Sequence, residues 1–378
     1  MKYPLLPYSQ LVFDMQKSNP EVYVSRTIAR LNKEEVDVPR LQLAIEQAIR
    51  NHPVYQMHVD EDGMQQYEPL EDILHGQYHA VEFVDKGAFV DVHIVGNRIL
   101  GDGRSDVLII EDVIRAYQGL HLQQDTYLEY LQQIEEEKQS ARYETNRQWL
   151  EAKYGNLSCP VHPHTDFPLQ ETDVSIEGMY QNDYSPLRDA LDNFVSKNLL
   201  SYTGFFSLAS ALAMMEYNNC DAAALTWAYD GRETEQEQRI YGSLHRDVPF
   251  LMKVEGEQLK VKEELIREAR NQIRQGIAHS SYPFTLTKPH TETWNYALNV
   301  LVQPSLQEKT IAVPFAFEDI TPDIEPHIAY SLLDVEIIET EQLRINYRYS
   351  ATHYKPESIE RFAALVRRYA EWLLKDES

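Results

Sequence analysis

The sequence contains few cysteines and no long hydrophobic run. Among its 378 residues there are two cysteines, Cys159 and Cys220, which are too few for a disulfide framework and fit a reducing compartment. No run of about 18 apolar residues is present to span a bilayer. The start, MKYPLLPYSQ, lacks the apolar core and cleavage site of a signal peptide. We therefore expect a cytoplasmic protein with no membrane association.

Basic residues are also scarce, with 35 Lys and Arg against 60 Asp and Glu and a formal net charge of −25. Such a field repels a phosphate backbone, and no cluster of Lys and Arg compensates for it, so we expect no nucleic-acid partner. The sequence has no Gly-x-Ser-x-Gly elbow and no phosphate-cradling glycine loop. These absences argue against a hydrolase of the elbow type and against nucleotide binding.

The chain alternates predicted strands with predicted helices, which indicates an α/β or α+β class. In order, the patterns predict a helix within 3–19, a strand at 22–31, a helix from Asp37 to Pro53, a hairpin at 56–67, a strand near 91–97, a helix to 117, a long helical stretch at 126–155, helices at 185–200 and 203–217, a strand at 222–228, a polar loop at 231–242, a helix at 259–278, β-rich runs at 296–302, 310–317, 329–338 and 342–349, and a helix at 356–374.

One strand–turn–helix stretch carries polar residues to the end of a strand. Val92 and Ile94 mark its apolar face, while His93 and Asn97 point to the other face, and the turn that follows contains Asp102. Folds often place working side chains at strand ends and in the loops that leave them. This stretch is therefore the first candidate for a functional site.

The length favours two lobes over one core. The segment 156–183 changes character, with Pro160, Pro163 and Pro168 and few periodic apolar residues, and we interpret it as the crossing between the lobes. The predicted domains are residues 1–165 and residues 166–378. The two halves have a similar rhythm of elements, which suggests two similar lobes.

Several short motifs, taken in order, resemble those of the condensation domains of nonribosomal peptide synthetases, within the chloramphenicol acetyltransferase-like superfamily. The similarity runs nearly end to end. The matching segments are YPLLPYSQ at the start, Asn51-His52-Pro53, the stretch from Gly96 to Asp106 in place of the family's HHxxxDG region, Thr165-Asp166-Phe167-Pro168, Tyr229-Asp230-Gly231-Arg232, the stretch from Tyr241 to Pro249, and His279 with Pro283-Phe284.

This resemblance implies two acetyltransferase-like lobes in a V-shaped arrangement with a tunnel between them. It also implies that carrier proteins deliver acyl or aminoacyl groups on phosphopantetheine arms, with no cofactor bound directly to this chain. In the family, the second histidine of the motif is associated with amide formation. In the family, the motif aspartate is mainly structural and is normally held by an arginine of the second motif.

The motif departs from the family at the two histidine positions, which are Asn97 and Arg98, while Asp102 and Gly103 are retained. An imidazole can accept a proton at neutral pH, whereas a guanidinium has no acceptor and stays charged, although it can donate to a developing oxyanion. Gln56 occupies the place of the family's second-motif arginine. We hypothesise that Arg98 pairs with Asp102. The pair would then be either a structural salt bridge or part of an altered acyl-transfer site.

Other chemically suggestive residues have a structural alternative. His93 is a displaced base or an ordinary strand histidine, and His279 matches a motif position that looks structural. The set Cys159, His162, His164 and Asp166 has ligand-like types, but its spacing fits no standard zinc pattern, so we expect no metal site. Within the apolar helix, Phe205, Phe206 and Met214 belong to the core or line the tunnel.

The sequence therefore predicts a condensation-domain-like protein of nonribosomal peptide biosynthesis that lacks ordinary amide-forming activity. It would act by binding peptidyl or acyl carrier proteins or a tailoring enzyme. The X domain of glycopeptide synthetases, which has arginine at the second histidine position, resembles it in kind. The alternatives are an active acyltransferase with a noncanonical site and a purely structural linker module. We expect a monomer; a stand-alone protein and an excised synthetase domain both fit.

Overall fold

The computed structural model describes residues 1–169, 175–254, 261–290, 294, 296–303, 314–322, 328–329 and 331–375. Contacts divide the chain into two compact units. Unit 1 comprises Met1–Gln139, Asp230–His245 and Pro304–Ile324, and unit 2 comprises Ser140–Tyr229, Arg246–Gln303 and Glu325–Ser378. This division differs from a single cut after residue 165, because a later segment packs with unit 1. The single lobe boundary stays a prediction.

Unit 1 holds most of the elements predicted for the first half of the chain. They are β1 (Lys2–Pro4), α1 (Pro7–Gln16), β2 (Val24–Asn32), α2 (Val38–Asn51), the 3-10 turn η1 (Pro53–Gln56), β3 (Met57–Val59), β4 (Met64–Tyr67), β5 (Ala80–Lys86), β6 (Phe89–Asn97), α3 (Gly103–Tyr117), α4 (Tyr127–Glu137), η3 (Glu237–Arg239) and β11 (Glu318–Asp319).

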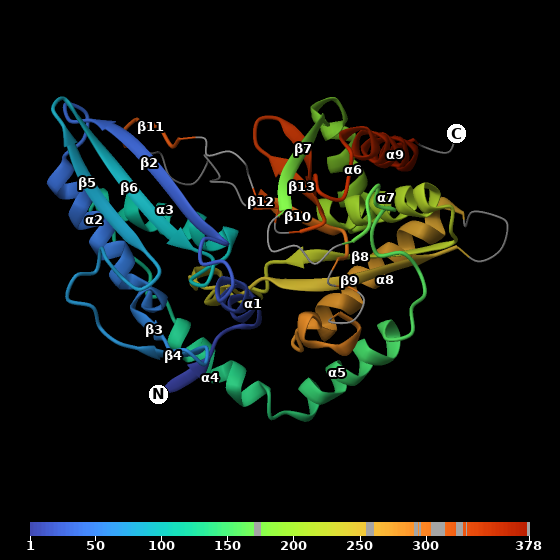
Figure 1. Cartoon of the computed structure of the whole chain (residues 1–378), viewed down its shortest axis with the longest axis horizontal. Coiled ribbons are helices and arrows are strands. Elements are labelled where there is room, and N and C mark those ends of the chain that lie inside the picture. Colours follow the sequence, from blue (N-terminus) through green and yellow to red (C-terminus); the bar gives the residue numbers. More distant parts are fainter. Residues whose placement is uncertain are drawn as a thin grey trace. The chain divides into compact units, whose positions relative to one another are not determined.

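The main sheet of unit 1 has the strand order β11-β2-β6-β5, and its neighbouring strands are antiparallel. Helices α2 and α3 lie side by side on one face of it (Figure 1). Val92 is buried, as predicted, whereas Ile94, two residues further along the same face of β6, is 39% exposed, so this face is not buried along the whole strand. The register pairs Val24 with Asn97, which fixes the end of β6 beside the start of β2.

Local signals explain where α2 begins and where the hairpin turns. Asp37 is the N-cap of α2, and its carboxylate accepts a hydrogen bond from the backbone N–H of Arg40 at 3.1 Å. The helix ends before Pro53, as predicted. Gly63 has a φ of +77° in the turn between β3 and β4, a conformation that glycine adopts without steric cost. The predicted helix and hairpin are confirmed.

Unit 2 contains a larger sheet and the most deeply buried helix. Its elements are α5 (Ala141–Tyr154), β7 (Ser175–Asp183), η2 (Ser185–Leu187), α6 (Arg188–Asn198), α7 (Tyr202–Asn218), β8 (Ala222–Tyr229), β9 (Arg246–Lys253), α8 (Lys262–His279), η4 (Phe284–Leu286), β10 (Asn299–Gln303), β12 (Ile328–Ala329), β13 (Leu333–Glu339), β14 (Leu343–Ser350) and α9 (Pro356–Leu374).

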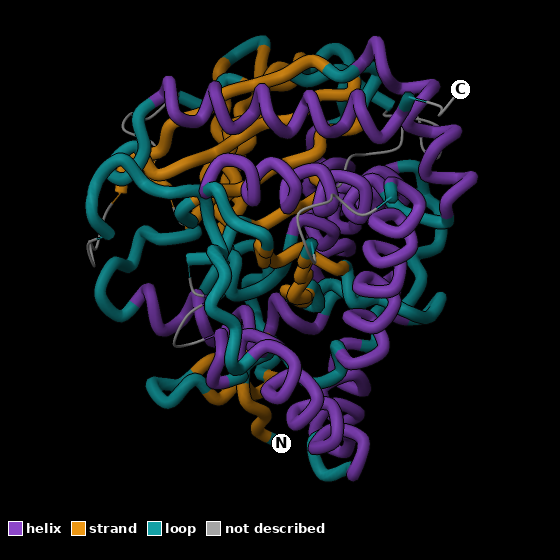
Figure 2. The backbone as a smooth tube through the Cα atoms, turned by 90° about the vertical axis from the view of Figure 1, so that its right-hand side faces the viewer, coloured by secondary structure: helices purple, strands orange, loops and turns teal. Residues whose placement is uncertain are grey.

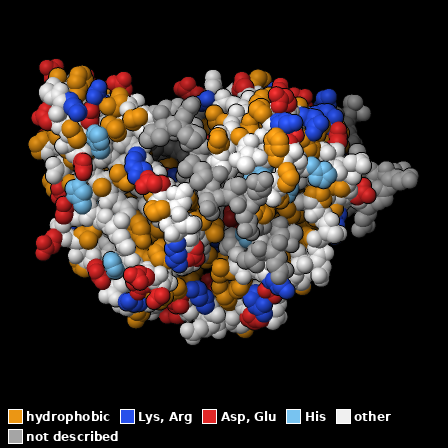
Figure 3. All heavy atoms as spheres, in the orientation of Figure 1, with side chains coloured by type: hydrophobic (Ala, Val, Ile, Leu, Met, Phe, Trp, Pro, Cys, Tyr) orange, Lys and Arg blue, Asp and Glu red, His pale blue; other side chains and the backbone are white. Residues whose placement is uncertain are grey.

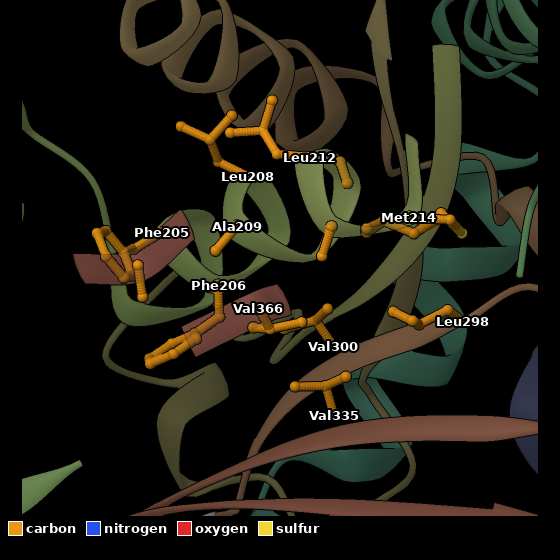
Figure 4. Close-up of a cluster of buried hydrophobic side chains, with 14 of the residues drawn as sticks. Phe205, Phe206, Leu208, Ala209, Leu212, Met214, Leu298, Val300, Val335 and Val366 are labelled. Atoms are coloured by element: carbon orange, nitrogen blue, oxygen red, sulfur yellow. The ribbon is translucent and has the colours of Figure 1, made fainter. Parts of the chain in front are cut away.

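The sheet of unit 2 has the order β12-β7-β14-β13-β10-β8-β9, with β13, β10 and β8 parallel. Helices pack on one of its faces (Figure 2). Helix α7 is the centre of this core, and its side chains meet Val300, Val335 and Val366 (Figure 4). Phe205, Phe206 and Met214 are fully buried there, so they are core residues and do not line a tunnel.

The structure differs from the predicted order of elements in three places. The stretch 126–155 is two helices, α4 and α5, separated at residues 138–140. Strand β7 lies inside the segment that we interpreted as an irregular crossing. Strand β9 was not predicted. It contains Pro249 and lies at the edge of the sheet, where a missing N–H is tolerated.

Some predictions lie partly outside the described residues. The β-rich run at 310–317 falls on residues 310–313, which the structure does not describe, and residues 314–317 are not in a strand. Within the described chain, no single helix is long and apolar enough to cross a membrane; the segments Ser185–Asn198 and Tyr202–Asn218 meet that test only as a pair bent by 99°. On the face shown in Figure 3, the described basic side chains are interspersed with acidic ones.

The core position of α7 predicts the effect of shortening one of its side chains. Leu208 has no exposed surface, and replacing it with alanine is expected to lower the free energy of unfolding by about 2–5 kcal/mol, since it leaves a cavity. All four tryptophans lie in unit 2, so tryptophan fluorescence during urea unfolding measures this unit.

The control is Leu286→Ala, since Leu286 is 49% exposed. That change is expected to cost less than about 1 kcal/mol. Equal losses for the two substitutions would show that α7 is not the packed centre of unit 2.

Candidate functional site

The candidate motif lies where β6 ends and α3 begins, as the sequence predicts. Asn97 is the last residue of β6, and Gly103 is the first residue of α3. Asp102 is the N-cap of α3, and its carboxylate accepts a hydrogen bond from the backbone N–H of Ser105 at 3.0 Å. Asp102 therefore has a structural role in starting the helix.

Asp102 accepts hydrogen bonds from six donor atoms and is 5% exposed. Both terminal nitrogens of Arg232 donate to it at 3.0 Å, one to each oxygen. The Ser105 hydroxyl adds a bond at 3.0 Å, and the backbone N–H groups of Leu244 and His245 donate at 2.9 and 3.1 Å. Such a set of donors satisfies a buried carboxylate completely.

The hypothesis that Arg98 pairs with Asp102 is wrong. Nη1 of Arg98 donates to Oδ2 of Asp106 at 2.6 Å; Asp106 lies in the first turn of α3, four residues after Asp102. The oxygens of Asp102 are already occupied by Arg232, so Arg98 takes the next carboxylate on the same face of the helix. Gln56, at the place of the family's second-motif arginine, is a buried residue of η1, and Arg232 supplies the cation of Asp102 instead.

Backbone geometry brings Arg232 to the motif. Gly231 has a φ of +75°, which turns the chain just before Arg232. The Arg232 side chain is fully buried, and it also donates to the backbone carbonyls of Ile240 and Gly242 at 2.9–3.2 Å. Arg232 thus ties the segment Asp230–His245 to the N-terminus of α3, and both belong to unit 1.

Asn97 is held by polar contacts of its own. Its side-chain amide exchanges hydrogen bonds with the amide of Gln16 at 3.2 Å, and its oxygen accepts from the backbone N–H of Ile99 at 3.0 Å. In the same loop, a Cβ on Gly101 would lie 2.6 Å from the ring of Tyr241, so only glycine fits there. These contacts fix the shape of the loop without leaving a proton acceptor at position 98.

Charges set the protonation of the two ion pairs. Burial would raise the pKa of Asp102, but Arg232 outweighs it and the pKa falls below its usual range. Burial would lower the pKa of Arg98, but Asp106 outweighs it and the pKa rises. Asp102 is therefore a carboxylate and Arg98 a cation at neutral pH. The guanidinium of Arg98 has no lone pair to accept a proton, and the oxygens of Asp102 are occupied by six hydrogen-bond donors.

A second polar cluster lies behind the motif, around the fully buried ring of His52. Nδ1 of His52 lies 2.6 Å from Asp125 Oδ2, and Nε2 lies 3.2 Å from Asp112 Oδ2. Arg239 is paired with Asp112, and the backbone N–H of Tyr241 donates to Asp125 at 2.9 Å. The cluster therefore connects α2, α3 and the segment Asp230–His245.

The pKa of His52 reflects this environment. Burial would lower it, but the hydrogen bonds and charges of Asp112 and Asp125 raise it above its ordinary value. Burial would raise the pKa of Asp112, but His52 and Arg239 lower it. The folded state therefore favours an imidazolium between carboxylates, and this charge contributes to stability.

The remaining candidates have structural surroundings. His279 stacks on Trp149 at 3.9 Å, and its Nδ1 lies 2.8 Å from Asn146 Oδ1. His93 lies in β6 opposite Ile28 and Glu82, and its role as a displaced base is not tested.

The residues of the possible metal set have other partners. Asp166 accepts hydrogen bonds from the Lys355 backbone and the Ser358 hydroxyl at the start of α9, and Nδ1 of His162 lies 2.8 Å from the carbonyl of Pro163. Among the described residues, no group of three or more His, Cys, Asp or Glu side chains is arranged to hold a metal ion.

Sequence analysis missed two residues at the motif. Arg232 was named as part of a motif but was given no role. The Gly231-Arg232 pair shortly after a strand was the available sign, because a buried aspartate needs a cation as its partner. His245 was not considered at all. It lies beside Asp102, with Nδ1 at 4.0 Å from Oδ2, and local sequence gives no sign of this because 143 residues separate the two.

Comparison with protein families gives one match, since the model of the condensation domain matches residues 98–377. No curated protein matches the sequence.

Solved structures with this fold are similar over their whole length. The epimerization domain from the third module of tyrocidine synthetase B shares 15% identity at a TM-score of 0.78, covering 99% of this chain and 97% of that one. The condensation domain from monacolin K polyketide synthase shares 12% at 0.76, covering 99% and 98%. A mutant starter condensation domain of rhizomide synthetase, in complex with C8-CoA and Leu-SNAC, shares 16% at 0.71, covering 99% and 94%.

The His52 cluster predicts a pH-dependent contribution to stability. A raised pKa means that the contribution is complete below the unfolded value of about 6.5 and is lost as the pH rises through the folded value. His52→Gln should therefore cost about 3–5 kcal/mol at pH 6 and less at pH 9. Hydrogen exchange of α2 and α3, corrected for its intrinsic pH dependence, measures the local unfolding free energy.

His75→Gln is the matched control, because His75 is paired with Asp72 at 2.8 Å but is 48% exposed. A surface pair of this kind contributes less than about 1 kcal/mol. A cost for His52→Gln that grew with pH would contradict the charged state of the cluster.

Proposed function

Because this chain belongs to the condensation-domain family, we propose that it engages acyl or aminoacyl groups carried on the phosphopantetheine arms of carrier proteins, in nonribosomal peptide biosynthesis. We also propose that it does not form amide bonds by the family's ordinary route through the second motif position. The rhizomide synthetase domain supports the first statement, since it was solved with C8-CoA and Leu-SNAC.

The observation that carries the second statement is the state of Arg98. Its guanidinium is a cation tied to Asp106 at 2.6 Å and has no lone pair with which to accept a proton. The ordinary route needs an imidazole or an equivalent acceptor near the attacking amine. Arg98 therefore lacks the property that the second motif histidine provides.

Loss of the ordinary route leaves two roles. In one, the domain binds a carrier protein or a tailoring enzyme without chemistry, as the resemblance to the X domain suggests. In the other, it is an acyltransferase with a noncanonical site. One observation favours the second role, which is the imidazole of His245 next to Asp102.

Other parts of the function stay predictions. The partner arms would be the source of phosphopantetheine, and the chain itself would bind no cofactor directly. A carrier protein or tailoring enzyme as partner, the monomeric state and a cytoplasmic location are likewise proposed on the sequence and the family alone.

The proposal predicts a small effect of removing Arg98. In the acyltransferase role, with C8-CoA as donor and Leu-SNAC as acceptor, product formed by Arg98→Ala is expected to stay within about threefold of that formed by the native chain, because a residue outside the general acid–base step costs far less than the usual 10²–10⁴-fold. Mass spectrometry of the acylated leucine product measures the rate.

The matched control is Arg104→Ala, which removes an arginine near the motif, in the first turn of α3. A loss of 100-fold or more in Arg98→Ala alone would mean that Arg98 takes part in the chemistry. Product made only by Arg98→His would point to decay of an ancestral enzyme. Failure of the native chain to bind a phosphopantetheine-loaded carrier protein would remove the first part of the proposal.

A further inference from the structure

The motif loop has no proton acceptor at position 98, but an imidazole lies against the same loop. We infer that His245 is the catalytic base of this domain and replaces the missing second histidine from another segment of the chain. The inference rests on the proposed function in its acyltransferase form. His245 lies in the segment Tyr241–Pro249, which the sequence comparison assigned no chemistry.

The backbone of His245 is fixed by the motif aspartate. Its N–H donates to Asp102 Oδ2 at 3.1 Å, next to the bond from the Leu244 N–H at 2.9 Å. Asp102 is in turn held by Arg232 and caps α3. The contacts that make Asp102 structural therefore also set the position of His245 relative to the motif.

The ring of His245 is positioned by a packed aromatic neighbour. Tyr8, on α1, meets it edge to face, with ring centroids 4.1 Å apart and an interplanar angle of 67°. Tyr8 also packs against Tyr23, with ring centroids 6.1 Å apart. The backbone carbonyl of Tyr23 accepts a hydrogen bond from the backbone N–H of Arg98 at 3.1 Å. Contacts thus run from position 98 through Tyr23 and Tyr8 to His245, all within unit 1.

The polarity of the site selects one nitrogen of the ring. Nδ1 is buried, lies 4.0 Å from Asp102 Oδ2, and has no hydrogen-bond partner among the described residues. The nearby carboxylate favours the tautomer with its proton on Nδ1, which leaves Nε2 to accept a proton. The side chain is 20% exposed, so the ring is not sealed in the core. The backbone bond to Asp102 and the packing against Tyr8 hold the ring in place, and Nε2 is the nitrogen left to act as a general base.

The step that His245 would assist is aminolysis of a thioester. The amine nitrogen of the acceptor attacks the thioester carbonyl carbon of the donor, and the C–N bond forms. Nε2 of His245 takes the proton that the nitrogen loses. The C–S bond then breaks, and the proton passes from the imidazolium to the departing thiolate, which leaves as a free thiol. The products are an amide and a thiol, and His245 returns to its neutral form.

His245→Gln tests the inference with C8-CoA and Leu-SNAC as probes. The variant should lose product formation by about 10²–10⁴-fold in kcat with little change in KM, since general-base catalysis contributes that much. His75→Gln is the matched control, because it removes an exposed imidazole from the same unit. Circular dichroism verifies the fold of both variants.

A second measurement does not depend on turnover. Diethyl pyrocarbonate acylates accessible neutral imidazoles, so His245 should be modified in the native chain and protected by C8-CoA, whereas the fully buried His52 should not react. An unmodified His245, or a His245→Gln variant with the native rate, would overturn the inference.

Binding measurements distinguish failure of the His245 assignment from failure of the proposed function. If calorimetry shows that C8-CoA binds but the native chain makes no product, the assignment of His245 fails while the carrier-arm function stands. If C8-CoA and loaded carrier protein both fail to bind, the proposed function fails as well.

Discussion

The buried pair of Asp102 and Arg232 is the interaction on which the organisation of unit 1 depends. A carboxylate this deeply buried is costly unless every lone pair is used, and six donor atoms converge on it. These donors come from the first turn of α3 and from the segment Asp230–His245. One ion pair therefore caps the helix and anchors a segment that is more than a hundred residues away in sequence.

The same pair shapes the chemistry proposed for the loop. Because Arg232 satisfies Asp102, Arg98 is free of it and pairs with Asp106 instead. The cation at position 98 then has no part in proton acceptance. Two backbone bonds to Asp102 hold Leu244 and His245 in place, so the interaction that makes the aspartate structural also brings an imidazole to the loop. The His52 cluster also holds this segment in place, because the backbone N–H of Tyr241 donates a hydrogen bond to Asp125.

The local part of this structure could be predicted from sequence. Asp37 predicts the start of a helix, Pro53 its end and Gly63 a turn. The strand–turn–helix around Asp102 is predicted by the periodicity of apolar residues and the positions of the glycines. The tertiary part could not. The sequence around Asp102 does not show that its partner is Arg232, which lies 130 residues later. Pairing at that separation depends on the tertiary fold, which brings the segment of Arg232 back to the start of α3. Strand β9 was not predicted; its proline is tolerated at an edge, and edges are a property of the assembled sheet.

The most direct measurement is a pair of double-mutant cycles on the unfolding free energy of unit 1, obtained from hydrogen exchange of α3. The cycles combine Asp102→Asn with Arg232→Met and with Arg98→Met. A buried bidentate pair predicts a coupling of about 2–3 kcal/mol between Asp102 and Arg232, and less than about 0.5 kcal/mol between Asp102 and Arg98. A larger coupling to Arg98 than to Arg232 would contradict the account, because the aspartate would then be held by the motif itself.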